Sequence, residues 1–183
     1  MKEQKKLLGE ERRNLLLNML KNSQQPITGA ELAKKANVSR QVIVGDITLL
    51  KARNEPIIAT SQGYLYLHPV NGQKEATKTI ACYHPPERTE EELNLLVDHG
   101  VTVKDVKIEH PVYGDLTASV MVSNRKEVQM FMERIRSTNA SFLSELTDGV
   151  HLHTISAPNE QYLLEAEKAL EKAGFLMIVE EQE

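Results

Sequence analysis

The stretch VSRQVIVGDITLLKARNEPIIATSQGYLYL, residues 38–67, carries two hydrophobic periods in succession. Its first half repeats apolar residues at helical spacing, and Ser39 stands just before it, where a hydroxyl can accept a hydrogen bond from a free backbone N–H. The inner face of this predicted helix comprises Val42, Ile43, Ile47 and Leu50. Two strand-like runs then flank the turn SQG, which is typical of a β-hairpin. The stretch therefore predicts a capped helix followed by a hairpin.

Two further helices are predicted ahead of this stretch. The first lies in GEERRNLLLNMLKNS, with an apolar face formed by Leu15, Leu16, Met19 and Leu20. The second, GAELAKKA, begins after Thr28, whose spacing to Glu31 is that of a capping box. Helix, short turn, helix is the helix-turn-helix plan, and the hairpin makes it a winged helix-turn-helix. The segment resembles the module that opens biotin-ligase-type repressors and many ligand-sensing repressors.

Such a module contacts DNA through the helix that follows the turn. Arg40 and Gln41 open this helix, where a recognition helix meets base edges, and Arg can pair with guanine and Gln with adenine. The alternative is that both are solvated first-turn residues. Gly45 is unexpected in this helix, because glycine inside a helix costs about 1 kcal/mol of stability relative to alanine. Since it has no side chain, the question of which residues contact bases near this position stays open. The predicted phosphate contacts are Lys34, Lys35, Lys51 and Arg53.

Charge is divided unevenly along the 183-residue chain, whose net charge is −4. Residues 1–68 carry 11 Lys and Arg against 6 Asp and Glu, whereas residues 69–183 carry 11 against 20. Only the front part is expected to meet a polyanion such as double-stranded operator DNA. No apolar run is long enough for a membrane span, and the polar N-terminus predicts no signal peptide. The single cysteine, Cys82, fits a reducing cytoplasm and is expected in the core rather than as a nucleophile.

Strand and helix patterns alternate after a polar linker, NGQKEA, at 71–76. We place the boundary there, with one domain at 1–70 and another at 71–183. Strands are predicted at 79–84, 101–110, 115–122, 150–156 and 175–179, and helices at 89–100, 123–137 and 159–174. Thr89 is the predicted cap of the first of these helices, and Gly100 its end. The mixture favours an α+β sandwich, a mostly antiparallel sheet with helices on one face.

The segment DGVHLHTIS, residues 148–156, holds two of the six histidines. Side chains two positions apart on a strand point to the same face, so His151 and His153 lie about 6.6 Å apart. Imidazoles at this separation can both bind one metal ion. A solvated or hydrogen-bonded histidine pair has the same spacing and is the alternative.

Three more residues can complete a site of this kind. His84 and His110 each end a predicted strand, where a sheet can bring them together with other histidines. Glu92 lies in the first turn of a helix, although it is alternatively the capping partner of Thr89. Imidazole and carboxylate ligands suit a divalent ion of Zn, Ni, Mn, Fe or Co.

Four segments carry a closer resemblance: YHPPERTEEEL, GVTVKDVKIEHPVYGDLT, STNASFL and LTDGVHLHTISAP. With the winged-helix segment, they resemble the NiaR family of nicotinate-responsive repressors, whose second domain is called the three-histidine domain. The resemblance implies a cytoplasmic transcription repressor with nicotinic acid as co-repressor, acting on genes for NAD biosynthesis or niacin uptake. It also implies one metal ion per chain in the second domain. The ligands would be His84, Glu92, His151 and His153, with His110 as the remaining histidine motif.

Nicotinate offers a carboxylate and a ring nitrogen. Either group can take an open position on the metal, and His110, Arg88 or Tyr113 can bind the other end. Arg88 is alternatively a plain surface charge. A homodimer is expected, since winged-helix repressors bind palindromes.

Two other functions stay open at this point. One is a metal-dependent sensor of another small carboxylate. The other is a metal-dependent hydrolase, although the sequence has no H-E-x-x-H, no Gly-rich phosphate loop and no G-x-S-x-G. We therefore predict that the chain is not an enzyme.

Overall fold

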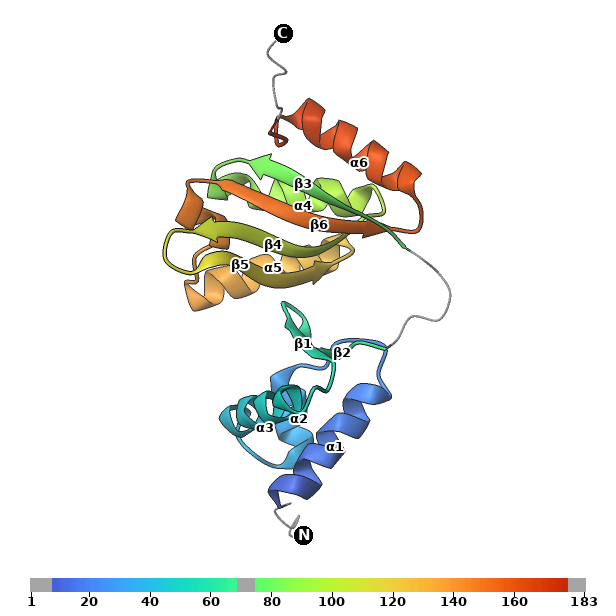
Figure 1. Ribbon diagram of the computed structural model, residues 1–183, viewed down its shortest axis with the longest axis vertical. Helices are drawn as coiled ribbons and strands as arrows, with labels where there is room; N and C mark the ends of the chain where they lie inside the picture. The colour runs from blue at the N-terminus through green and yellow to red at the C-terminus, as the bar shows by residue number, and fades with distance from the viewer. Residues whose placement is uncertain (1–7, 69–74, 178–183) are drawn as a thin grey trace. The chain divides into compact units, whose positions relative to one another are not determined.

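The computed structural model describes residues 8–68 and 75–177. The chain divides into two compact units, Met1–Asn71 and Gly72–Glu183 (Figure 1). Each unit has its own apolar core. The predicted linker at 71–76 falls mostly outside the described residues, and Ala76 already begins a strand. Among the described residues, no helix has the length and apolar character needed to cross a membrane.

The N-terminal unit is a winged helix-turn-helix, as predicted. Its elements are α1 (Gly9–Lys21), α2 (Gly29–Ala36), α3 (Arg40–Ala52), β1 (Ile57–Thr60) and β2 (Gly63–Tyr66). The capping box forms, because Glu31 N donates to Thr28 Oγ1 at 3.2 Å and the Glu31 carboxylate accepts from Thr28 N at 2.9 Å. The Ser39 hydroxyl caps α3 by accepting from Val42 N. The capping box thus fixes the start of α2, and the Ser39 cap fixes the start of α3 after the turn.

The inner face of α3 differs from the predicted one at its first position. Ile43, Ile47 and Leu50 are buried, but Val42 is 37% exposed. Asp46, three residues after Ile43, occupies the inner face instead and is only 3% exposed. On α1, Leu16 and Leu20 are buried, whereas Leu15 and Met19 are half-buried. The predicted face of α3 therefore included one exposed residue, Val42, whereas on α1 the half-buried Met19 still packs against the core.

A buried ion pair explains the polar residue inside α3. Asp46 Oδ2 lies 2.5 Å from Arg12 Nε, and Asp46 Oδ1 lies 3.3 Å from Arg13 Nη1. Both arginines are on α1, and their side chains are 12% and 15% exposed. Charges removed from water must be paired, so this carboxylate ties the recognition helix to α1 in one position.

The C-terminal unit is built on one antiparallel sheet. Its strands are β3 (Ala76–Tyr83), β4 (Thr102–His110), β5 (Gly114–Val122) and β6 (Val150–Ala157), in the order β3-β6-β4-β5. The helices are α4 (Thr89–Asp98), α5 (Arg125–Thr138) and α6 (Glu160–Ala173), with short 3-10 turns at Pro86–Arg88 and Leu143–Thr147. Every neighbouring pair of strands is antiparallel. This confirms the predicted α+β architecture.

All three α-helices share one core with the sheet. Figure 1 shows α4 and α5 on one face of the sheet, and α6 adds Leu163, Ala166 and Leu170 to the same cluster of buried residues. Cys82 on β3 is fully buried in this core, as expected. The other face of the sheet is more exposed, as Tyr83 and Leu152 show.

Two local predictions in this unit were wrong or only partly met. Thr89 does not cap α4: it is the first residue of the helix, the cap position is Arg88, and the Thr89 hydroxyl is buried without a partner among the described residues. The turn Pro86–Arg88 leads directly into the helix, so no extended capping residue is needed. At the predicted last strand, 175–179, the described residues form one isolated β-bridge, between Leu176 and Cys82. The last two residues of this predicted strand lie outside the described ranges.

We predict that Asp46→Ala lowers the free energy of unfolding of the N-terminal unit by about 3 kcal/mol, because it leaves two largely buried arginines without this carboxylate. Glu10→Ala removes a largely exposed carboxylate that pairs with Arg53 and Arg13 but leaves Asp46 in place; it serves as the control, with a smaller expected loss. Urea denaturation of both variants measures the difference. Equal stability of the two variants would contradict a structural role for Asp46.

Candidate metal centre and DNA-reading surface

Four of the predicted metal ligands come together inside the C-terminal unit. His151 and His153 lie on β6, His84 follows the end of β3, and Glu92 reaches them from α4. Pairing of β3 with β6 and the packing of α4 on the sheet bring them close. Their exposed fractions are 4% and 3% for the two β6 histidines, 2% for His84 and 0% for Glu92. We call these four residues the histidine–glutamate cluster.

The three histidines present the same ring nitrogen to one carboxylate oxygen. The Nε2 atoms of His84, His151 and His153 lie 2.7, 3.4 and 3.3 Å from Glu92 Oε2. The rings of His84 and His151, and those of His151 and His153, meet edge to face. Glu92 Oε2 therefore marks the point on which three imidazoles converge.

Each histidine directs its other ring nitrogen, Nδ1, to a backbone carbonyl. A carbonyl oxygen only accepts hydrogen bonds, so each Nδ1 carries a proton. A proton on Nε2 as well lets each ring donate to the Glu92 carboxylate. Loss of that second proton leaves a neutral ring with a free lone pair on Nε2, which is the arrangement of metal-bound histidines with backbone support. The three Nδ1 atoms lie 2.9, 2.9 and 2.6 Å from the carbonyl oxygens of Pro85, Gly149 and Asp105 for His84, His151 and His153.

Electrostatics hold Glu92 in its charged form. Burial alone would raise the pKa of Glu92, but the charge of His153 and hydrogen bonds from the three histidines hold the pKa well below its usual value. Burial would lower the pKa of His84 and of His153, but the hydrogen bonds and charge of Glu92 raise both. The cluster thus attracts positive charge to its centre, whether protons or a metal ion.

The donor set suits a divalent transition metal. Three imidazole nitrogens and one carboxylate oxygen match the ligand types of Zn, Ni, Co, Fe and Mn sites. Glu92 Oε1 is also buried, and no described residue gives it a hydrogen bond. A buried carboxylate oxygen without a partner is costly, and a cation would satisfy it.

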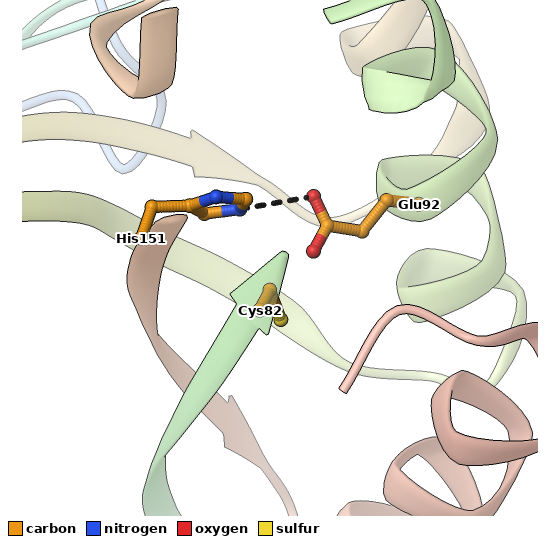
Figure 2. A group of neighbouring side chains, drawn as sticks. All are labelled: Cys82, Glu92 and His151. Atoms are coloured by element: carbon orange, nitrogen blue, oxygen red, sulfur yellow. Dashed lines mark hydrogen bonds and ion pairs between the residues drawn. The ribbon is translucent and has the colours of Figure 1, made fainter. Parts of the chain in front are cut away.

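One residue beside the histidine–glutamate cluster, Cys82, was not predicted as part of the site from the sequence. Cys82 Sγ, a carboxylate oxygen of Glu92 and a ring nitrogen of His151 all lie within 4.8 Å of one another (Figure 2). Burial raises the pKa of the Cys82 thiol, and the charge of Glu92 raises it further. The sequence held a signal for this position, since Cys82 lies two residues before His84 on a strand and so shares its side of the sheet.

The backbone of Gly149 contacts both His84 and His151. Its carbonyl oxygen accepts from His151 Nδ1 at 2.9 Å and from His84 N at 3.4 Å. Its φ is +95°, and a Cβ at this position would lie 2.4 Å from the carbonyl oxygen of His84. Only glycine fits this conformation and this contact.

The predicted effector residues have other surroundings. His110 and Tyr113 lie at the β4–β5 turn with ring centroids 5.1 Å apart, and His110 Nδ1 accepts from the backbone N–H of Tyr113. Arg88 pairs with Glu91 at 2.9 Å, donates to the carbonyl oxygen of Ala173 and lies over the ring of Phe175. The described contacts thus tie His110 and Tyr113 to each other, and Arg88 to α4 and to the end of α6.

An open pocket lies beside the cluster. Its volume is about 480 Å³, and its lining includes Tyr83 and Pro85, which flank His84 in sequence. Gly149 also lines it, together with the carboxylates Glu145 and Asp148. A small molecule in this pocket would be next to the backbone that supports His84 and His151.

The predicted DNA contacts are on the surface of the N-terminal unit. Arg40 and Gln41 are exposed in the first turn of α3, and a Cβ at Gly45 would meet no atom within 4 Å. Arg53 differs from the others, because its guanidinium is paired with Glu10 at 2.7 Å. Among the other predicted phosphate contacts, Lys34, Lys35 and Lys51 are exposed.

A winged helix-turn-helix with an exposed basic helix, followed by a separate unit with its own buried polar cluster, defines a DNA-binding transcription regulator. Residues 12–65 match the family described as the HTH domain, and residues 77–179 match the 3H domain family. The chain is 64% identical over 178 residues to the transcription repressor NadR of Bacillus subtilis, covering 97% of this chain and 99% of that protein. It is 38% identical over 172 residues to the probable transcription repressor NiaR of Thermotoga maritima, covering 94% and 97%.

The chain belongs to this NadR and NiaR family of transcription repressors. Membership confirms the resemblance seen in the sequence, and with it the prediction of a repressor that binds DNA through its helix-turn-helix domain. It also confirms that the chain is not an enzyme. The hydrolase alternative is therefore wrong.

We predict that Gly149→Ala destabilises the C-terminal unit by about 3 kcal/mol, because left-handed backbone strain adds to a clash with the His84 carbonyl. Gly114→Ala is the matched control: its φ is also positive, at +69°, but a Cβ would meet nothing within 4 Å. It should cost only about 1 kcal/mol. Thermal unfolding of both variants measures the difference, and equal losses would show that the contact with His84 carries no cost.

Proposed function

We propose that this repressor acts in the cytoplasm on genes for NAD biosynthesis or niacin uptake, with nicotinic acid as co-repressor. Its domain at 1–70 binds operator DNA, and its domain at 71–183 binds the effector and one divalent transition-metal ion. The metal ligands are His84, Glu92, His151 and His153. The observation that carries the proposal is the convergence of three Nε2 atoms on Glu92 Oε2, with each Nδ1 bonded to a backbone carbonyl.

The metal is proposed to supply the positive charge that attracts nicotinate. The pocket beside the cluster is lined by Glu145 and Asp148, which would repel a carboxylate. A bound divalent ion would offset this repulsion and offer an open position to the carboxylate or to the ring nitrogen. His110, Arg88 or Tyr113 is proposed to bind the other end, which requires that at least one of them leave its present contacts. A sensor of another small carboxylate fits the same chemistry, and only the effector test separates the two.

DNA binding is proposed to use a homodimer with one recognition helix per half-site, since winged-helix repressors bind palindromes. Arg40 and Gln41 would contact bases, and Lys34, Lys35 and Lys51 would contact phosphates. Arg53 would first have to exchange Glu10 for a phosphate. Nicotinate raises DNA affinity only if it binds the DNA-competent conformation more tightly than the other.

We predict that Arg40→Ala weakens operator binding by about 1–3 kcal/mol and relaxes sequence preference, because a contact to a base edge is lost. Lys34→Ala should weaken binding to all sequences alike and reduce its salt dependence, because it removes a phosphate contact. Fluorescence anisotropy with operator and scrambled duplexes at several salt concentrations separates the two. Normal sequence preference in Arg40→Ala would mean that another residue contacts the bases.

We predict that nicotinate raises operator affinity roughly 5–150-fold, that nicotinamide does so poorly, and that His84→Ala loses both the metal and this response. Basal DNA binding by His84→Ala should persist, because it rests on the N-terminal unit. His99→Ala is the matched control, a histidine of the same unit whose Nδ1 is bonded to the Leu95 carbonyl.

Operator titrations with and without effector, together with elemental analysis, test this prediction. A His84→Ala protein that still responds fully to nicotinate would exclude the cluster as the sensor. A wild-type protein that responds to another small carboxylate and not to nicotinate would favour the alternative sensor.

A further inference from the structure

We propose that Cys82 is a fifth ligand of the metal ion, bound as a thiolate beside the histidine–glutamate cluster. The inference rests on the proposed metal site and adds a donor of a different class to it. It starts from position: Cys82 is the register partner of His151 across the β3–β6 pair, so the two side chains lie side by side on the same face of the sheet. Their donor atoms and a Glu92 oxygen fall within 4.8 Å of one another.

The second observation is the orientation of Glu92. Its Oε2 faces the three histidines, but its buried Oε1 has no hydrogen-bond partner among the described residues. Figure 2 shows the Glu92 carboxylate facing both His151 and Cys82, with one oxygen in the ion pair with His151 and the other on the cysteine side. An ion placed among these three side chains would satisfy the unpartnered oxygen and reach the sulfur at the same time.

Charge balance favours a thiolate at this position. A divalent ion with three neutral imidazoles and one carboxylate leaves a net charge of +1 inside a fully buried site, which is costly. A thiolate brings the net charge to zero. Binding would proceed as Cys–SH plus M²⁺ giving Cys–S–M⁺ plus H⁺, with the proton released to solvent, and coordination deprotonates a thiol even where burial keeps the free group protonated.

The proposal narrows the choice of metal. Sulfur ligands favour zinc, cobalt, nickel and iron over manganese, which prefers oxygen donors. It also leaves room for an effector, because five protein donors on a six-coordinate ion leave one position open. The chemistry expected of the centre is therefore that of a mixed nitrogen, oxygen and sulfur site for a borderline-soft divalent ion.

X-ray absorption at the zinc edge tests the inference on the full chain loaded with one equivalent of Zn²⁺. The wild-type protein should show a sulfur scatterer at about 2.3 Å besides nitrogen and oxygen at about 2.0–2.2 Å. Cys82→Ser should lose the sulfur and keep the other shell, with zinc affinity reduced by more than the roughly 10–100-fold typical of changes outside the ligand sphere. Met132→Leu, which removes a buried thioether from the same core, should keep the sulfur signal.

Each outcome of these measurements either supports or overturns the role of Cys82 as a metal ligand. Bound zinc with only nitrogen and oxygen neighbours in the wild type would overturn the role of Cys82 and leave the proposed metal site standing. No bound zinc in the wild type would overturn both. If Cys82→Ser does not fold, the wild-type spectrum and a sulfur-to-metal charge-transfer band in the cobalt-loaded wild type still decide, since Cys82 is the only cysteine of the chain.

Discussion

The bonds from three imidazole Nδ1 atoms to backbone carbonyls are the constraint on which the C-terminal unit depends. They fix the tautomer of each ring and point every Nε2 at Glu92. The carbonyl of Asp105 belongs to β4, whereas those of Pro85 and Gly149 lie in the segments that follow β3 and precede β6, so the sheet and its adjoining segments set the geometry of the cluster. A change in the register of β3, β6 or β4 would turn these histidines away from one another.

The N-terminal unit depends on a comparable buried polar contact. Asp46 takes an inner position of α3 that an apolar residue would ordinarily fill, and it binds two arginines of α1. The outer face of the same helix is then free to present Arg40 and Gln41. In each unit a buried carboxylate, Asp46 or Glu92, contacts basic side chains from other segments. These contacts orient the helix that carries the carboxylate.

Much of this arrangement could be predicted from the sequence, because it follows from short-range periodicity. Alternation placed His151 and His153 on one face, and the T-x-x-E spacing gave the capping box at Thr28. What failed depended on tertiary context. The same T-x-x-E spacing at Thr89 forms no cap, because a 3-10 turn precedes the helix and Glu92 turns inward. The buried position of Asp46 follows only from the packing of α3 against α1, which no local pattern reports. The spacing of Cys82 to His84 is visible in the sequence, but its place beside His151 depends on the pairing of β3 with β6.

Three Nε2 atoms and Glu92 are proposed to hold one metal ion in the C-terminal unit. Nitrogen-15 NMR of the imidazole rings in the zinc-loaded protein tests this proposal most directly, because proton-bearing, free and metal-bound ring nitrogens have distinct shifts. His84, His151 and His153 should each carry the proton on Nδ1 and bind zinc through Nε2, while His99 should be unaffected by zinc. A proton on Nε2 in any of the three, or zinc bound without a change in their shifts, would contradict it.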